Sequence, residues 1–420
     1  MTGAAAMLAA GVLLILRVPV LAVAVAVSAL SVGVLAAQGA VTLTDAGAAF
    51  WRDLAGLAGP ELALIPLVAL FGNLALYSGL STRIYDAAAV LMRGMPGGAV
   101  IAALLGCGGF AGLSGSSVAC ATTMGRICVP DMMQAGIRPG VAGASVAIGG
   151  TLGALIPPSV LLVLFGLLTG APVAALFLAG IVPGVMSLAV MVAVALIWGR
   201  GGRAVSPAEP GARRHAIAAA LPAVAVFALL IGLLTVGAGV AMLAGVALMA
   251  VIGVVQGRLP PERWGAVLMQ SLRHSGIFLA VLLAARVMMT LIPMTGLFDL
   301  LPVGPGLWLM GVVVALLGLG MVMQPLAVLV LAMPFLATMI DAQGAAAVWL
   351  AVLTIKLLEI GLVTPPVGLA VFVVARAALP GRDGAIFAAV VPFLLADLAV
   401  LAALILFPAL SLCLPQMMGM

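Results

Sequence analysis

Two apolar stretches of the chain each contain a pair of adjacent prolines. Pro157 and Pro158 interrupt "GALIPPSVLLVLFG", and Pro365 and Pro366 interrupt "EIGLVTPPVGLAVFV". Proline has no N–H and restricts the residue before it, so carbonyls one turn upstream lose their intrahelical partners. Each pair therefore predicts a helix break. Its free carbonyls suit a bare hard cation, and the N–H groups of the next half-helix suit a carboxylate.

Short polar runs accompany both breaks. In the first half the run 114–117 ("SGSS") supplies hydroxyls, and the segment 149–156 supplies carbonyls. In the second half the corresponding segments are 320–325, which contains Gln324, and 359–364, which ends on a threonine. The alternative for a single hydroxyl is a bond back to the carbonyl four residues earlier in its own helix. For a cluster opposite a break we favour a binding site.

Two charges stand within the apolar stretch "WLAVLTIKLLEIGLVTPP". Lys356 and Glu359 are three residues apart, and a charge at the bilayer centre costs about 2.5–3.5 kcal/mol on insertion scales. An inward-facing pair beside a break is therefore a functional hypothesis. The alternative is a structural pair that holds a transport core against a scaffold. Arg286 is similarly placed and is assigned no role, because its side chain can extend to the interface.

Side chains suited to enzymatic or transition-metal chemistry do not come together in the sequence. His215 and His274 flank apolar stretches, and the four cysteines show no CxxC spacing. The cysteines are therefore expected to be small core residues. We expect no catalytic residues, no transition-metal site and no organic cofactor, and so no enzyme.

The composition is that of a membrane protein. Hydrophobic residues make up 65% of the 420 and charged residues 7%, with a mean hydropathy of +1.40, against about 45–50% and about 25% in soluble domains. The 52 glycines and low aromatic content favour helices packed through small residues. The predicted fold class is an all-α polytopic membrane protein. The arginine-rich segment 199–215 is expected to be cytoplasmic.

Membrane-embedded segments follow from the hydropathy, since a helix needs about 20 apolar residues to span a bilayer. Candidate segments are 4–37, 61–80, 98–130, 140–168, 172–198, 216–235, 237–256, 275–296, 306–340, 345–377 and 385–412. Two of them, 98–130 and 306–340, are too long for one helix and have small or polar residues at their middles, which predicts re-entrant helical hairpins. The segments 81–97 and 257–276 predict amphipathic helices in the interface; the alternative is an ordinary polar connection.

The second half of the chain repeats the first. Gly153, Pro157 and Pro158 align with Gly361, Pro365 and Pro366 at an offset of 208 residues, and the hairpin midpoints align without a gap. Corresponding broken segments in two halves point to a transporter site at the repeat interface. The expected parts are scaffold spans and a first arm (1–97), a first transport core (98–170), scaffold spans with the basic loop and a second arm (171–276), a second transport core (277–384) and a C-terminal span (385–420).

These segments resemble a known family, the large membrane subunit (DctM type) of the tripartite ATP-independent periplasmic (TRAP) transporters. The resemblance covers nearly the whole chain. Its most specific motifs are the Gly-Ser-Ser hairpin followed by Pro130 and the segment "KLLEIGLVTPPVGLAVFVV". It implies inverted repeats and an elevator-type transport domain that moves against a scaffold.

The resemblance also implies an activity and partners. The expected activity is Na⁺-coupled import of an organic anion, commonly a carboxylate such as a C4-dicarboxylate or sialic acid, with Na⁺ as the coupling ion. The expected partners are a small four-helix membrane subunit, encoded separately, and a periplasmic substrate-binding protein. The expected location is the bacterial inner membrane, which the chain crosses several times.

The family's sites fall at the hairpin tips and helix breaks, and the resemblance carries them onto the matching positions of this chain. Expected Na⁺ ligands are Ser114, Gly115, Ser116, Ser117, Gly150, Thr151, Gly153, Gly320, Met323, Gln324, Glu359, Gly361 and Thr364. Expected substrate contacts are Ser116, Ser117, Pro158, Ser159, Gln324, Thr364 and Pro366. Many members carry an acidic residue where this chain has Gln324.

Two alternative functions remain open at this point. A divalent-anion/Na⁺ symporter of related fold, working without a soluble receptor, would share the hairpins and the breaks. A binding protein and a four-helix partner encoded beside the chain would argue against it. An assembly subunit that conducts nothing would not need paired breaks in one register.

Overall fold

The computed structural model describes residues 2–15, 18–37, 39, 42–56, 59–199, 209–294, 305–343 and 346–420. These residues form helices and connections without a strand. Seven of the described helices are long and apolar enough to cross a bilayer: Val20–Ala37, Pro60–Tyr77, Val173–Trp198, Gly211–Leu233, Ala238–Val255, Pro261–Thr290 and Asp383–Leu406. The prediction of an all-α polytopic membrane protein is thus confirmed. Most of the basic segment 199–215 lies outside the described residues.

The helices follow one another with short connections. In chain order they are α1 (Thr2–Ile15), α2 (Val20–Ala37), α3 (Leu43–Gly56), η1 (Pro60–Ala63), α4 (Leu64–Tyr77), α5 (Leu80–Leu91), α6 (Gly98–Ser114), α7 (Ser117–Gln134), α8 (Pro139–Gly150), η2 (Thr151–Ala154), α9 (Val160–Thr169), α10 (Val173–Trp198), α11 (Pro210–Leu233), α12 (Ala238–Val255), α13 (Pro261–Met294), α14 (Pro305–Val322), α15 (Pro325–Gln343), α16 (Ala347–Val363), α17 (Leu369–Ala378), α18 (Asp383–Leu406) and α19 (Ala409–Met417). The predicted second arm and the span after it form one continuous helix, α13.

Two helical hairpins are present at the predicted places. α6 ends at Ser114, because Gly115 adopts a left-handed backbone with φ +62° that glycine adopts without steric cost. Ser116 then caps α7 by accepting a hydrogen bond from the N–H of Ala119 at 3.4 Å. The second hairpin turns between α14 and α15, and α15 begins with Pro325, whose missing N–H would have had no partner at a helix start.

Both predicted helix breaks are present too, with one difference in position. α8 gives way to the 3-10 turn η2, and α9 begins only at Val160. Each proline pair lies in a gap between helices, and both Pro–Pro peptide bonds are cis. The second break starts later than expected, at Thr364. Glu359 and Gly361 therefore lie inside the last turns of α16, because nothing before Thr364 interrupts the helical hydrogen bonding.

The repeat extends through five consecutive helices. α6 to α10 correspond to α14 to α18, and the offset of 208 residues relates their ends: α7 and α15 begin at Ser117 and Pro325, while α10 and α18 end at Trp198 and Leu406. The duplication inferred from the proline pairs is therefore a duplication of structure.

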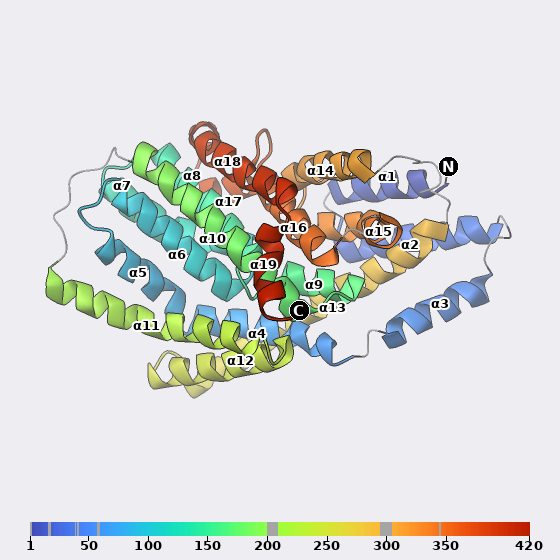
Figure 1. The fold of residues 1–420 in the computed structure, drawn as a ribbon, viewed down its shortest axis with the longest axis horizontal. Coiled ribbons are helices and arrows are strands. Elements are labelled where there is room, and N and C mark those ends of the chain that lie inside the picture. The colour runs from blue at the N-terminus through green and yellow to red at the C-terminus, as the bar shows by residue number, and fades with distance from the viewer. Residues whose placement is uncertain are drawn as a thin grey trace.

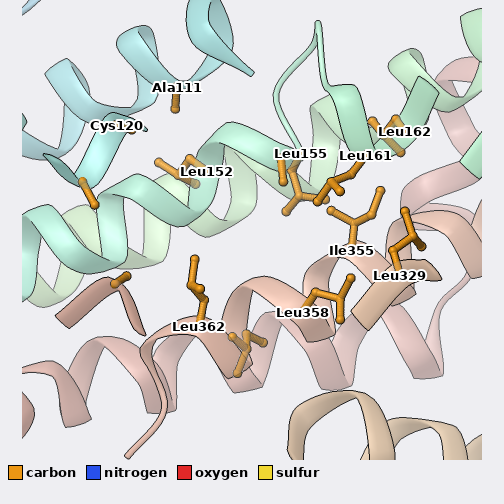
Figure 2. Close-up of a cluster of buried hydrophobic side chains, with 14 of the residues drawn as sticks. Ala111, Cys120, Leu152, Leu155, Leu161, Leu162, Leu329, Ile355, Leu358 and Leu362 are labelled. Carbon is orange, nitrogen blue, oxygen red and sulfur yellow. The ribbon is translucent and has the colours of Figure 1, made fainter. Parts of the chain in front are cut away.

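The two repeats pack directly on each other. α16 is buried from Leu350 to Val363 and lies against α10, α14, α15 and α18. Across the repeats, α8 packs against α18 and α7 against α17. Figure 2 shows Leu155 and Leu161 of the first repeat beside Ile355 of the second. Apolar burial of this kind makes the hairpins and broken helices one packed body.

The remaining spans form a second group. α4 packs against α12 and α13, α11 against α12, and α2 against α13. Figure 1 shows α4, α11 and α12 along one edge of the molecule, across from α14 and α18. α10, expected among the scaffold spans, packs against α6, α9, α16 and α18. The division into scaffold and transport core stays a prediction, and these contacts favour placing α10 with the core.

Candidate functional site

The two hairpin tips meet at a single cavity of about 350 Å³. One wall belongs to the packed repeats and includes the first tip (114–117), Gln324 at the second tip, and Glu359 of α16. The other wall comes from α4 and α13 and includes Asn73 and His274. The structure thus brings both tips and Glu359 to one space.

The first tip is held tightly against the first helix break. A Cβ added to Gly115 would lie 2.8 Å from the carbonyl oxygen of Pro158, so only glycine allows this approach. Ser116 is exposed to the cavity, Ser117 is buried at its edge, and the hydroxyl of Ser114 has no hydrogen-bond partner among the described residues. Oxygen atoms that are free to act as ligands therefore concentrate at this tip.

Glu359 is the most unusual residue of the cavity. Its side chain is 1% exposed, and within the described part of the chain its carboxylate forms no hydrogen bond of standard geometry; the hydroxyl of Ser117 lies close enough to interact with it. An unpaired ionised carboxylate removed from water carries a large free-energy penalty. Glu359 therefore needs a cation or a proton close to it.

The second tip presents a single polar side chain. Gln324 is exposed to the cavity, whereas Met323 is buried. Gly320 and Gly361 serve the contact between α14 and α16: a Cβ on Gly361 would lie 2.8 Å from the Cα of Gly320. Close helix packing therefore accounts for these two glycines.

Several predicted residues do not line this cavity. The hydroxyls of Thr151 and Thr364 donate to the carbonyls of Ile148 and Ile360, each at 2.6 Å, which is the alternative stated above for isolated hydroxyls. Ser159 is buried and caps α9. The predicted residues outside the cavity lining are Gly150, Thr151, Gly153, Pro158, Ser159, Gly320, Met323, Gly361, Thr364 and Pro366.

The first proline pair lines a separate, smaller cavity. Pro157 and Pro158 face a space of about 170 Å³ that is shared with Phe177 of α10 and Phe227 of α11. This space is apolar, so it offers nothing to an ion. It lies between the packed repeats and the second group of helices.

Lys356 pairs with a residue that the sequence analysis passed over. Its ammonium group forms a salt bridge with Asp397 of α18 and donates a hydrogen bond to the Ser187 hydroxyl of α10 at 2.6 Å. The expected pairing of Lys356 with Glu359 is therefore wrong, because Lys356 points toward α10 and α18. The signal was present as the single acidic residue in the apolar stretch 385–412.

A polar network covers the wall formed by α4 and α13. Asn73 donates to the carbonyl of Ala69 at 3.0 Å and to the hydroxyl of Ser271 at 2.9 Å, and its amide nitrogen lies 3.5 Å from Nδ1 of His274. Beside it, the Tyr77 hydroxyl donates to Oε1 of Gln270 at 3.2 Å. Sequence reasoning missed this wall. Its signals were the polar residues at 270, 271 and 274 in the segment predicted as an amphipathic arm, and Asn73 in the apolar segment 61–80.

Arg286 connects the two groups of helices. It lies on α13, and its Nη2 donates to the carbonyl of Leu167 in the last turn of α9 at 3.0 Å. A helix C-terminus has free carbonyls and partial negative charge, both of which suit a guanidinium group. The sequence assigned Arg286 no role, and the structure gives it this contact.

Comparisons with known proteins agree with the fold. Residues 7–410 match the family described as the tripartite ATP-independent periplasmic transporter, DctM component. The C4-dicarboxylate TRAP transporter large permease protein DctM of Rhodobacter capsulatus is 27% identical over 390 residues, which cover 86% of this chain and 88% of that protein. The sialic acid TRAP transporter large permease protein SiaM of Vibrio cholerae is 27% identical over 386 residues, covering 87% and 88%.

Similarity over shorter stretches and to a solved structure adds to this. The DctM protein of Pseudomonas aeruginosa is 33% identical over 137 residues, so the shared stretch is 32% of each chain, about a third of that relative's length. The crystal structure of the Alcanivorax borkumensis YdaH transporter has a TM-score of 0.65 at 17% identity and covers 93% of this chain and 98% of that one. At this identity the likeness concerns the fold alone.

The family match extends over nearly the whole chain and agrees with the duplicated hairpins and helix breaks. Its relatives are permeases of transport systems, and the helical spans place the chain in the inner membrane. The chain therefore belongs to the DctM component family of the TRAP transporters, and is a subunit of a transporter and not an enzyme.

Proposed function

We propose that this chain carries out Na⁺-coupled uptake of an organic anion. The anion is a carboxylate, such as a C4-dicarboxylate or sialic acid, the two classes named for the R. capsulatus and V. cholerae relatives. A periplasmic substrate-binding protein delivers it, and a small four-helix membrane subunit completes the membrane part.

The observation that carries the proposal is the buried carboxylate of Glu359, which forms no salt bridge among the described residues. Among the described residues that line its cavity there is no lysine or arginine, and Lys356 on the same helix is already paired with Asp397. A cation from solution would therefore supply the positive charge that Glu359 lacks. Oxygen ligands suit Na⁺, and they are supplied by the hydroxyls of Ser116 and Ser117 and by the free carbonyls at the end of α6. A cation bound there would satisfy Glu359.

The same geometry makes anion binding depend on the cation. The first turns of α7 and α15 both open onto the cavity, at Ser117, Val118 and Leu326. N–H groups in a first turn have no intrahelical partner and carry partial positive charge, which favours a carboxylate. Without the cation the charge of Glu359 opposes the anion. With it the charge is cancelled, and this dependence couples the two movements.

Transport then requires the cavity to open in turn to the two sides of the membrane. The hairpins and broken helices form one packed body, whereas α4 and α13 belong to the second group of helices. We propose that the packed body moves past the second group as an elevator-type transport domain and carries the ion and the anion with it.

Uptake by proteoliposomes tests the coupling. The vesicles contain this chain and its small subunit, the binding protein is added outside, and radiolabelled succinate and sialic acid are the probes. We expect uptake of at least one probe with an inward Na⁺ gradient and none without it. Glu359→Gln removes the charge and should abolish Na⁺ dependence, whereas Glu262→Gln, at an exposed position on α13, should behave as the wild type. Uptake that is indifferent to Na⁺ would contradict the proposal.

Omitting the binding protein from the same vesicles tests the partner assignment. A receptor-dependent system should show uptake near the background level. Full uptake without the binding protein would instead support a receptor-independent symporter of related fold.

A further inference from the structure

The wall of the cavity that faces the hairpin tips also carries polar side chains. Gln270, His274 and Phe278 of α13 line it at spacings of four residues, with Asn73 of α4 beside them. Residues four apart lie on one face of a helix. α13 therefore presents a single stripe to the cavity.

Hydrogen bonds fix the orientation of Asn73. Its amide nitrogen faces the carbonyl of Ala69, which can only accept. It also faces the hydroxyl of Ser271, whose hydrogen is already donated to the carbonyl of Val267 at 2.7 Å. An amide oxygen in that place would meet no donor, so the NH₂ group has to lie there.

This orientation determines what His274 offers to the cavity. Nδ1 of His274 lies 3.5 Å from the NH₂ group of Asn73. Both hydrogens of that group are directed to Ala69 and Ser271, and its nitrogen cannot accept, so an N–H on Nδ1 would have no acceptor there and the Nδ1 lone pair faces the group instead. The hydrogen of the neutral ring is then on Nε2. His274 lines the cavity and is only half-buried, so this N–H is a donor available to a ligand.

Gln270 forms one hydrogen bond within this wall. The Tyr77 hydroxyl donates to Oε1 of Gln270, which leaves the NH₂ group of Gln270 as the free end. The wall therefore carries two neutral donors side by side, and no acidic residue of the described chain lines the cavity on this side. Neutral donors of this kind suit oxygen acceptors on a ligand, especially a carboxylate.

We propose that His274 and Gln270 bind the second polar end of the transported anion, and that Asn73 positions His274. The inference rests on the proposed function and specifies its substrate class. The anion carries one carboxylate for the cation and the helix N-termini at the tips, and a second oxygen-bearing group for α13. A carboxylate with an apolar tail would leave both donors unpaired, and unpaired buried donors are costly.

Kinetics of uptake by the same proteoliposomes test the inference. Losing one hydrogen bond to a charged acceptor should raise the KM for the transported probe about 10- to 100-fold. We expect that rise for His274→Ala, with Vmax changed less than about threefold and the half-saturating Na⁺ concentration unchanged. His274→Gln keeps a donor and should lose less. His215→Ala changes the exposed histidine of α11 and serves as the matched control.

A double-mutant cycle tests the positioning role of Asn73. If Asn73 acts through His274, Asn73→Ala should raise KM, and the double variant should be no worse than His274→Ala alone. Additive effects would overturn the positioning role. A stable, monodisperse His274→Ala protein with a wild-type KM would overturn the binding role.

The outcomes also distinguish failure of this inference from failure of the proposed function. If the wild type takes up neither succinate nor sialic acid under a Na⁺ gradient, the proposed function fails, and the inference fails with it. If the wild type takes up a probe and Glu359→Gln abolishes Na⁺ dependence while His274→Ala changes nothing, only the inference fails. If an apolar monocarboxylate such as hexanoate competes as well as the transported probe, the assigned substrate class is wrong.

Discussion

The salt bridge between Lys356 and Asp397 gives a prediction with a calculable size. Lys356 is 1% exposed and Asp397 is fully buried, and one oxygen of Asp397 has no other partner among the described residues. Lys356→Met leaves the Asp397 carboxylate uncompensated in an apolar interior. Breaking a buried pair in this way costs about 3–5 kcal/mol. Replacing both partners, as in Lys356→Met with Asp397→Leu, removes both desolvation penalties and should recover most of that loss.

Equilibrium unfolding in detergent measures the effect. We expect the free energy of unfolding to fall by about 3–5 kcal/mol for either single variant and to return to within about 1 kcal/mol of the wild type in the double variant. Tryptophan fluorescence reports the transition, and Glu262→Gln is a matched surface control. A single variant as stable as the wild type would refute the reasoning. A double variant less stable than both single variants would also refute it, because the salt bridge would then stabilise the fold by more than the free energy lost in burying its two charges.

A chemical readout supports the unfolding measurement. Lys356 is the only lysine of the chain, so an amine-reactive reagent can modify that side chain and the N-terminal amine alone. In the folded wild type Lys356 should remain unmodified. In Asp397→Ala it should become modified at a rate that follows local opening, as mass spectrometry of the peptide around 356 would show. Rapid modification in the wild type would contradict the burial on which the prediction depends.

Two further predictions concern the first hairpin tip. Gly115→Ala places a Cβ 2.8 Å from the carbonyl oxygen of Pro158, in a residue with φ +62°. A side chain in that backbone conformation costs about 1–2 kcal/mol, so we expect the free energy of unfolding to fall by at least this amount. An unchanged stability would contradict the geometry of the tip. Ser116→Ala removes the cap of α7, worth about 1 kcal/mol, and a hydroxyl at the cavity. It should therefore raise the half-saturating Na⁺ concentration for uptake more than Thr364→Ala does, because the Thr364 hydroxyl donates to Ile360. Equal effects would remove Ser116 from the proposed ion site.

The architecture of the core could be predicted from the sequence because local chemistry determines it. Gly115 and the proline pairs stop helices wherever they stand, and the offset of 208 residues between the pairs shows the duplication directly. The same reasoning placed the second break too early. Residues Glu359 to Val363 have ordinary helix propensity, so the helix continues through them. It ends at Thr364, because the residue before a proline disfavours the helical conformation.

The long-range pairings could not be predicted in this way. Lys356 finds its partner 41 residues later on another helix, and the choice between Glu359 and Asp397 depends on which faces of α16, α10 and α18 pack together. The donor wall of α13 has the same origin. Asn73 and His274 are 201 residues apart, and only the packing of α4 on α13 makes them neighbours.

The hydrogen bond from Arg286 to the end of α9 has a consequence for the proposed movement of the packed body past the second group of helices. The last four carbonyls of a helix have no intrahelical partner, and a guanidinium group offers five N–H donors. In that proposed movement, a shift of α9 along α13 would let the arginine pass from the carbonyl of Leu167 to a neighbouring one before it releases the first. The guanidinium group would then stay hydrogen-bonded over a short displacement of α9. It would oppose only a displacement longer than about one helical turn.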